Sequence, residues 1–280
     1  MPKYLDDAGL RNIWTSIENL NSWMPANAPS HNSIYRGKNI TSALEDGSIY
    51  SAISSGTFDD IFIGDYFFAI INDISASILN SELVVNISSD WATHLFRVMK
   101  LGKTEKGQNY ALVMPDDSIG RSPIHSKNSL ENGFAGSDMV TKVFPKLERV
   151  LKNKFKLISV NQYLISDLQN PDVDIVRSPV KLLNELEVFG SWINANNNYE
   201  LQAGLDTSQL PGFRYNTDLC LDSKWWLRSI ASNSSNSYRF SVVLKNGACE
   251  TSLLTDINDL RPAFYIGLSD SYQLPEENPV

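Results

Sequence analysis

The amino-acid sequence predicts an α+β protein in which a short N-terminal helix precedes a mixed domain. Apolar residues recur at helical spacing in two stretches, 6–20 and 138–152. From Lys224 onward, β-forming residues alternate with turn signals typical of antiparallel strands. With 42% hydrophobic and 20% charged residues in 280, the composition is that of a globular protein with a sizeable core.

The first predicted element is an amphipathic helix over residues 6–20, which Asp6 or Asp7 can cap. Its apolar face must be covered, either by the body of the same chain or by a partner chain. We expect this face to form an oligomer interface, and its central residues are Leu10, Ile13, Trp14 and Ile17.

A polar stretch with two prolines, residues 21–33, follows this helix and is predicted to be a linker. The chain is therefore divided into residues 1–33, a docking or oligomerisation helix with its linker, and residues 34–280, an α+β body.

The body is predicted to begin with a helix at 42–55, where Ser42 and Glu45 have capping-box spacing and Gly56 ends the helix. Apolar, β-prone residues then predict strands at 61–71 and 110–114, with weaker candidates at 83–87 and 94–101. The paired acids Asp59 and Asp60 are expected to accept backbone N–H bonds at the entry to the first strand.

Two further helices are predicted in the middle of the chain. Residues 138–152 carry the clearest helical stripe, although Pro145 should delay or kink the helix start. The second helix runs from the cap Ser178 to Gly190, with Pro179 at its first position.

The C-terminal part is predicted to form one small antiparallel sheet. Its strands are expected at 225–228, 238–244, 249–254 and 261–266, with an Asn246-Gly247 hairpin turn and a Ser- and Asn-rich loop at 231–237. Core packing is expected for at least one of Trp225 and Trp226, the alternative being a sugar-stacking platform. Arg228 and Arg261 are expected to make structural ion pairs or carbonyl contacts rather than to contact a ligand.

The sequence lacks the common signatures of catalysis and of metal or cofactor binding. The three histidines stand in unrelated contexts, and adjacent acids such as Asp116 and Asp117 are more typical of turns than of glycoside hydrolysis. Cys220 and Cys249 show no zinc spacing; they are expected to be small apolar residues, with a disulfide bridge as the alternative. We therefore expect no enzyme activity, no metal and no cofactor.

Charge and hydropathy restrict the partners. A net charge of −8 without a basic cluster argues against nucleic acid as a partner. The sequence has neither an apolar stretch of membrane length nor a signal peptide, so we expect no membrane contact and synthesis in the cytoplasm.

Several motifs resemble, in the same order, those of virion structural proteins from phages and prophages of Gram-positive bacteria. They are SGTFDDIFIGDY at 55–66, VMPD at 113–116, GSDM at 136–139, LEVF at 186–189, WWLR at 225–228 and RPAF at 261–264. Residues 4–14 are also similar to a motif near domain starts in such tail and fibre proteins.

The ending WWLR…RPAF looks like the terminus of C-type-lectin-like domains, so the resemblance implies an antiparallel sheet of that kind at the C-terminus. It also implies a receptor surface on the polar segments between these motifs. Amides, hydroxyls and a tyrosine suit polyhydroxylated ligands, and the predicted receptor-binding residues are Asn233, Ser235, Asn236, Tyr238 and Asn246.

The predicted function is therefore that of a structural component of a phage particle, at the tail tip, baseplate or fibre. Its expected partners are other virion proteins, copies of itself, and a host-surface glycan or protein, and its expected location is the virion. The alternatives are an architectural virion adaptor without receptor contact, a bacterial surface carbohydrate-binding module, and a glycoside hydrolase acting on wall polymers.

Overall fold

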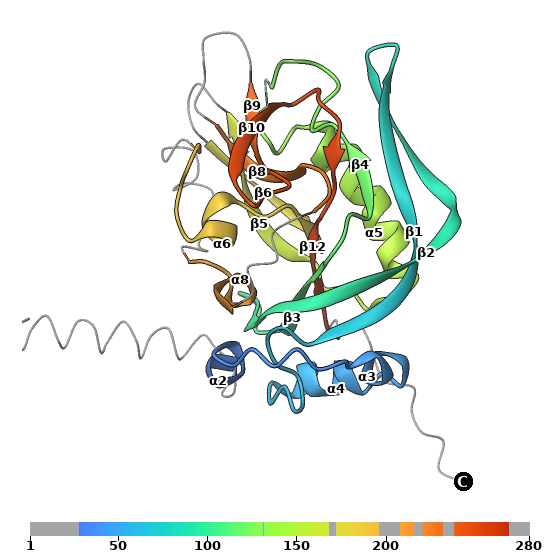
Figure 1. Ribbon diagram of the computed structural model, residues 1–280, viewed down its shortest axis with the longest axis vertical. Coiled ribbons are helices and arrows are strands. Elements are labelled where there is room, and N and C mark those ends of the chain that lie inside the picture. Colours follow the sequence, from blue (N-terminus) through green and yellow to red (C-terminus); the bar gives the residue numbers. More distant parts are fainter. Residues whose placement is uncertain are drawn as a thin grey trace, which may run out of the picture.

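A ten-stranded sheet forms the frame of the molecule in the computed structural model, which describes residues 28–130, 132–167, 172–195, 208–215, 221–231 and 238–268 (Figure 1). The strands are β1 (Tyr66–Leu79), β2 (Glu82–Lys103), β3 (Asn109–Pro115), β4 (Gly120–Ser122), β5 (Val160–Asp167), β6 (Asp172–Ser178), β7 (Val180–Lys181), β8 (Trp225–Ile230), β9 (Arg239–Val243), β10 (Cys249–Leu253), β11 (Asn258–Asp259) and β12 (Ala263–Ile266). The helices are α2 (Ala28–Asn32), α3 (Thr41–Glu45), α4 (Ser48–Ser55), α5 (Phe144–Lys152), α6 (Glu185–Phe189) and α8 (Pro211–Tyr215), with a π-helical turn η1 (Met139–Val143).

The strand order is β10-β9-β8-β11-β4-β1-β2-β3-β12-β7, and β5 pairs separately with β6. Neighbours are antiparallel except for the parallel pairs β1–β4 and β8–β11. The chain is thus an α+β protein, as predicted, with more strand than helix. The four predicted C-terminal strands do form, but they are not one small sheet: β8, β9 and β10 lie at one end of the large sheet and β12 lies between β3 and β7.

Two hydrophobic clusters pack on the two faces of this sheet, except on the solvent-exposed side of the β1–β2 hairpin. Side chains alternate between the two faces of a strand, so Trp226 joins the larger cluster while its neighbour Trp225 joins the smaller one. In β12, Phe264 joins the larger cluster and Tyr265 the smaller. Helix α5 packs against the larger cluster through Phe144, Leu147, Val150 and Leu151, and residues of α6 and α8 belong to the smaller.

The predicted helix at 138–152 is confirmed as η1 followed by α5. Pro145 is the second residue of α5 and directly follows the π-helical turn, so the helix changes type where the proline removes an N–H donor. The preceding turn is π-helical rather than α-helical, which agrees with the predicted irregular start.

Two predicted helices differ from the structure. The helix at 42–55 is divided into α3 and α4 because Gly47 adopts a left-handed conformation, φ +78°, and the Ser42–Glu45 capping box is not formed. The predicted start at Ser178 is wrong: β7 occupies part of this stretch, and α6 begins at Glu185 behind a capping box of Asn184 and Glu187. The predicted ends at Gly56 and Gly190 are confirmed, since both are left-handed caps.

Strand β1 begins at Tyr66, five residues later than predicted, because Asp60 and Gly64 have positive φ and form a tight turn before it. The two weaker strand candidates at 83–87 and 94–101 are parts of one 22-residue strand, β2. The β5–β6 hairpin was not predicted. Residues 28–32, expected to end a linker, form α2, from which Asn32 exchanges hydrogen bonds with the Leu101 backbone.

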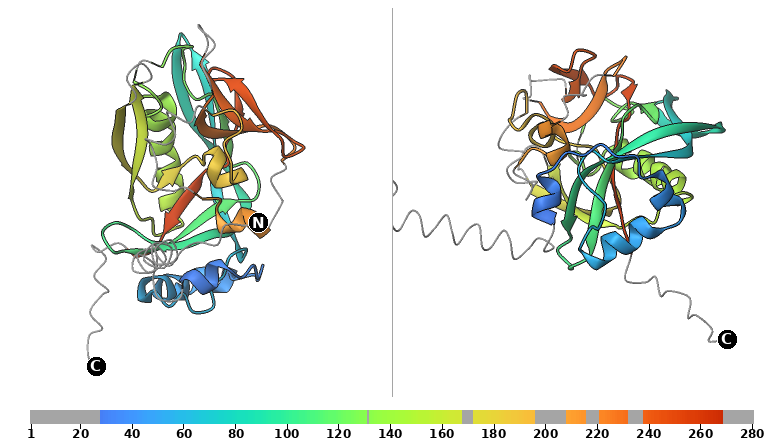
Figure 2. Two further views of the ribbon diagram at one scale, coloured as in Figure 1. Left: turned by 90° about the vertical axis from the view of Figure 1, so that its left-hand side faces the viewer. Right: turned by 60° about the horizontal axis from the view of Figure 1, so that its bottom comes forward.

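The N-terminal helices form a layer at one end of the molecule, below the β1–β2 hairpin (Figures 1 and 2). The predicted helix over 6–20 and its face of Leu10, Ile13, Trp14 and Ile17 lie outside the described residues. Within the described part of the chain, no helix has the length and hydropathy needed to cross a bilayer.

Candidate functional site: a polar hollow at the C-terminal sheet

A polar hollow of about 500 Å³ lies where loops from four parts of the chain meet beside β8 and β11. It is lined by Asp117, Ser118, Leu221, Asp222, Ser223, Lys245 and Asp259. Asn246, one of the predicted receptor-binding residues, is the neighbour of Lys245 in the exposed β9–β10 turn. Carboxylates, hydroxyls and an ammonium group offer both acceptors and donors to a polyhydroxylated ligand.

The framework beneath this hollow is buried and closely bonded. Trp225 and Trp226 both have no exposed surface, and the indole N–H of Trp226 donates to the Ser122 carbonyl at 2.7 Å. Arg261 donates through Nε to the Pro115 carbonyl at 2.8 Å, and its guanidinium carbon lies 5.3 Å from the centre of the Trp225 ring. The sugar-platform interpretation of the two tryptophans is therefore wrong, and the structural role expected for Arg261 is confirmed.

Two acids of the hollow, Asp259 and Asp222, each have a charged partner. Asp259 accepts hydrogen bonds from Arg121 Nε at 3.0 Å and from the Ser223 hydroxyl. Asp222 and Lys245 form an exposed ion pair at 3.1 Å. Their charges remain accessible to solvent, whereas Asp259 is mostly buried and fixes the wall of the hollow.

Asp117 is linked to the buried imidazole of His94, which lies between two carboxylates. Its Nδ1 is 3.0 Å from Asp117 and its Nε2 is 2.8 Å from Asp73. Burial alone would lower the pKa of His94, but the hydrogen bonds and charges of Asp117 and Asp73 outweigh it and raise this pKa to about 9. At neutral pH the imidazolium therefore joins the hollow to the β1–β2 hairpin.

Glu185, which anchors the 193–195 segment, was not predicted from the sequence. This fully buried carboxylate accepts hydrogen bonds from the backbone N–H groups of Ile193, Asn194 and Ala195 and from the Ser241 hydroxyl on β9. Burial of the neighbouring Cys249 thiol, followed by the negative charge of Glu185, raises the pKa of this thiol to about 12. The available signal for Glu185 was its position directly before the quoted LEVF motif and directly after the capping Asn184.

The structure describes only part of the predicted receptor surface. Asn233, Ser235 and Asn236 lie outside the described residues. Tyr238 is partly buried and packs against the larger cluster, so it is more a support than a free contact. Asn246 is exposed and its Oδ1 accepts the Ala248 N–H at 3.0 Å, which confirms the predicted hairpin turn.

Cys249 is a free thiol among the described residues, while Cys220 lies outside them. Arg228 on β8 is 9% exposed, and the structural contact expected for its side chain stays a prediction.

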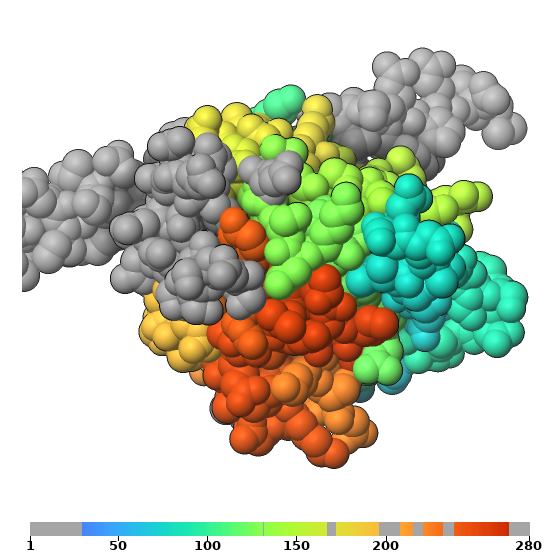
Figure 3. All heavy atoms as spheres, turned by 90° about the horizontal axis from the view of Figure 1, so that it is seen from above, coloured from blue at the N-terminus to red at the C-terminus, as the bar shows by residue number. Residues whose placement is uncertain are grey.

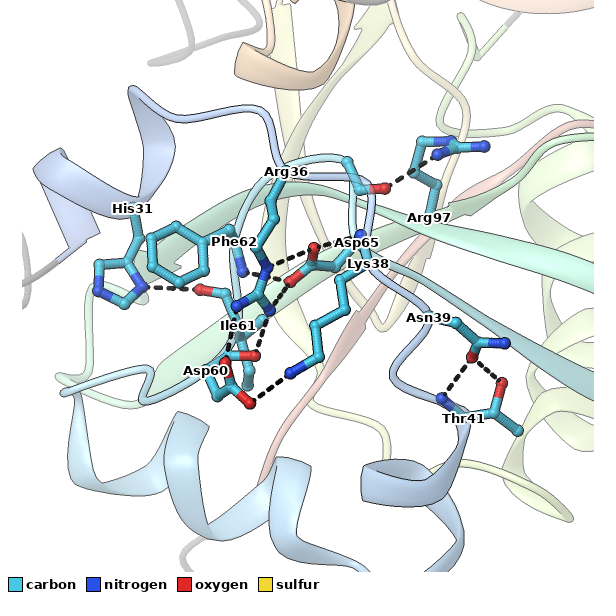
Figure 4. Close-up of polar contacts among 11 residues, drawn as sticks. His31, Arg36, Lys38, Asn39, Thr41, Asp60, Ile61, Phe62, Asp65 and Arg97 are labelled. Carbon is cyan, nitrogen blue, oxygen red and sulfur yellow. Dashed lines mark hydrogen bonds and ion pairs between the residues drawn. The ribbon is translucent and has the colours of Figure 1, made fainter.

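A second polar cluster lies in the motif at 55–66 and is internally paired (Figure 4). Arg36 donates to Asp60 at 2.7 Å and forms a close ion pair with the buried Asp65, while Lys38 donates to Asp60 at 2.7 Å. The hydrogen bond from Lys38, followed by that from Arg36, lowers the pKa of Asp60. The expected backbone N–H bonds go to Asp65, which accepts from Phe62 and Lys38, rather than to Asp59 or Asp60.

This cluster ties the 35–39 segment to the entry of β1, so we interpret it as structural. A hollow of about 440 Å³ adjoins it between α3, α4 and the loop at 59–61. The described residues contain no group of three or more His, Cys, Asp or Glu side chains suited to hold a metal ion.

Comparison of the chain with protein-family models, with curated proteins and with solved structures found no match. Function therefore has to follow from the residues and their geometry.

Proposed function

We propose that this chain is a structural component of a phage particle, at the tail tip, baseplate or fibre, and that its C-terminal end binds a host-surface glycan. In this proposal β8 to β12 correspond to a C-type-lectin-like sheet, with the WWLR and RPAF motifs as its framework. The observation that carries the proposal is a polar hollow next to the predicted Asn246 turn; Asp259 in its wall pairs with the completely buried Trp225 of β8.

Rigid support with a polar surface is what a shallow glycan site needs. Loops bind a ligand best when a packed scaffold fixes their position. The contacts of Trp226 and Arg261 provide such a scaffold. Sugars offer hydroxyls, which pair with carboxylates, hydroxyls and amides. Each site should bind weakly, with sub-millimolar affinity at best, so attachment would depend on many copies acting together.

The test replaces the exposed ion pair of the hollow, Asp222→Ala with Lys245→Ala, and measures adsorption of assembled particles to host cells. This double variant keeps the net charge, and an exposed pair contributes little to stability. The matched control is Lys224→Ala with Glu250→Ala, an exposed pair on the same sheet that does not line the hollow. We expect the first pair of substitutions to reduce adsorption and the control to leave it unchanged.

A companion variant tests the predicted loop, with Asn233, Ser235 and Asn236 replaced by Ala. Tyr238 is kept, because its packing against the core would confuse a loss of binding with a loss of stability. If correctly assembled particles with both sets of substitutions adsorb like the wild type, receptor binding is excluded for this end of the molecule.

That outcome would favour the architectural adaptor. The β1–β2 hairpin supports this role, because it exposes the aromatic residues Phe68 and Trp91. Labelling the protein in images of the virion separates both virion roles from a bacterial surface carbohydrate-binding module. Release of reducing ends from host wall would instead identify a hydrolase.

A further inference from the structure

The β1–β2 hairpin, which we call the arm, has a solvent-facing apolar surface. It extends along one side of the body and protrudes from it when seen from above (Figures 1 and 3). Trp91 is 63% exposed, Ile70 50% and Phe68 43%. The register pairs Phe68 with Leu95, Ile70 with Thr93 and Asn72 with Trp91, so these side chains share one face. We call Phe68, Ile70, Trp91 and Leu95 the arm face.

The opposite face of the same hairpin is buried, which shows that the exposure is not a property of the whole arm. Phe67, Ala69 and Ile71, which alternate with the arm face, are at most 2% exposed. Clustered exposed aromatic residues mark surfaces that bind other proteins, because tryptophan and other large side chains provide most of the binding energy in such interfaces.

The arm also has free strand edges. Strand β3 pairs with β2 only from Phe96 onward, and β4 pairs with β1 only at Ile74 and Ser75. At the base of the arm, the 39–41 segment covers the β1 edge at Tyr66 and Phe68. Over most of the arm, therefore, β1 and β2 pair only with each other among the described strands. Long, uncovered edges of this kind are prone to pair with other chains unless a partner covers them.

Charge indicates which partner covers the arm. Between residues 66 and 96 the chain has three acids, Asp73, Glu82 and Asp90, and no lysine or arginine. Of these three acids, only Asp73 is paired with the His94 imidazolium, which also pairs with Asp117. Two arms laid against each other would therefore bring like charges together, and a basic surface is the better complement.

Such a surface exists on this same chain, although its net charge is −8. Lys142, Lys146 and Arg149 recur at spacings of four and three residues, so they align along η1 and α5. We call them the basic ridge. Among the described residues, Lys146 and Arg149 have no ion-pair partner, whereas Lys142 pairs with Asp138. A guanidinium or ammonium group on this ridge also suits the exposed ring of Trp91.

The ridge and the arm face cannot meet within one molecule. Helix α5 packs its apolar side into the cluster that also contains the buried face of β1. The ridge is on the solvent side of α5 and the arm face is on the solvent side of β1, so the two surfaces point away from each other. A contact between two different surfaces of identical chains is head-to-tail and can close into a ring.

We infer that the arm face of one copy docks on the basic ridge of a second copy. This contact is separate from the predicted N-terminal interface, and it holds whether or not the C-terminal hollow binds a glycan.

The test uses two full-length variants, each lacking one surface. The arm variant carries Phe68→Ser and Trp91→Ser, and the ridge variant carries Lys146→Glu and Arg149→Glu. Neither variant alone can form the contact, but a mixture can, because the intact ridge of the first meets the intact arm of the second. Any association through the N-terminal segment is the same in all samples.

We expect the mixture to associate about 10-fold or more tightly than either variant does with itself in sedimentation experiments, which corresponds to roughly one hot-spot contact. Added salt should weaken the association of the two variants in the mixture, because the ridge is charged. The controls are Ile175→Ser, at a residue that is 60% exposed on β6, and Lys103→Glu with Lys106→Glu, which should associate like the wild type.

Equal association of the mixture and of each variant alone would overturn the inference. So would a wild type that stays monomeric up to its solubility limit. Unchanged melting of both variants verifies that they are folded.

Discussion

Tryptophan has opposite roles in two regions of this sheet. In β8, Trp225 and Trp226 have no exposed surface, and polar side chains face solvent around them. On the arm, Trp91 is 63% exposed and the polar residues flank an apolar face. The first arrangement supports a rigid surface for weak polar contacts, and the second is suited to protein contact. The difference shows that a tryptophan has a functional meaning only together with its surroundings.

The largest expected effect tests the buried side of this comparison. Trp225→Ala should destabilise the protein by about 3–5 kcal/mol, because it empties a fully buried aromatic site. Trp91→Ala, in contrast, should change the free energy of unfolding by no more than about 0.5 kcal/mol. Chemical denaturation of both variants measures the two values, and similar losses would erase the distinction between the regions.

The next effect concerns the anchor of the 193–195 loop. Glu185→Ala should cost about 1–3 kcal/mol, because it removes the acceptor of several backbone N–H groups. Hydrogen exchange at Ile193, Asn194 and Ala195 should accelerate, and Glu185→Gln should restore part of the protection. Glu250→Ala, at an exposed acid, is the control. Unchanged exchange in Glu185→Ala would show that the loop is held by other contacts.

The His94 bridge connects the two regions and should respond to pH. Because its folded pKa of about 9 exceeds the unfolded value of about 6.5, its contribution is fully present below pH 6.5 and is lost as pH rises through 9. The loss should be roughly 1–3 kcal/mol, since solvent screens the partly exposed Asp73 and Asp117. Stability curves of the wild type and of His94→Gln measure it; the variant should lack this decline, and equal curves would contradict the bridge.

The smallest effect is expected on the arm, where two neighbouring isoleucines face opposite sides. Ile70→Thr should leave the free energy of unfolding within about 0.5 kcal/mol of the wild type, because Ile70 is 50% exposed. Ile71→Thr should cost about 1–3 kcal/mol, because it places a hydroxyl in the core. Equal costs would mean that the arm is covered within a single chain.

Local signals predicted those parts of the fold that depend on neighbouring residues. The Asn246-Gly247 turn, the caps at Gly56 and Gly190 and the stripe of α5 follow from backbone conformation and periodicity, which act over a few residues. The arm could not be predicted at its full length, because Ser88, Ser89 and Asp90 interrupt the apolar pattern of β2 at an irregular pairing.

The candidate site was predictable only in outline. Asn246 was identified because polar turn residues are visible in the sequence. The carboxylates of the hollow, Asp117 and Asp259, come from distant segments that the strand order brings together through β4 and β11. No spacing in the sequence encodes that proximity, and Glu185 looked like an ordinary helix residue until its loop partners were in place.

The alternation in β8 and β12 has a consequence for folding. Each of these strands contributes consecutive side chains to both hydrophobic clusters, Trp226 and Phe264 to one and Trp225 and Tyr265 to the other. Neither cluster can lose its packing without displacing a strand that forms a wall of the other. The two cores should therefore melt together in one calorimetric transition, as a single cooperative unit rather than as two foldons.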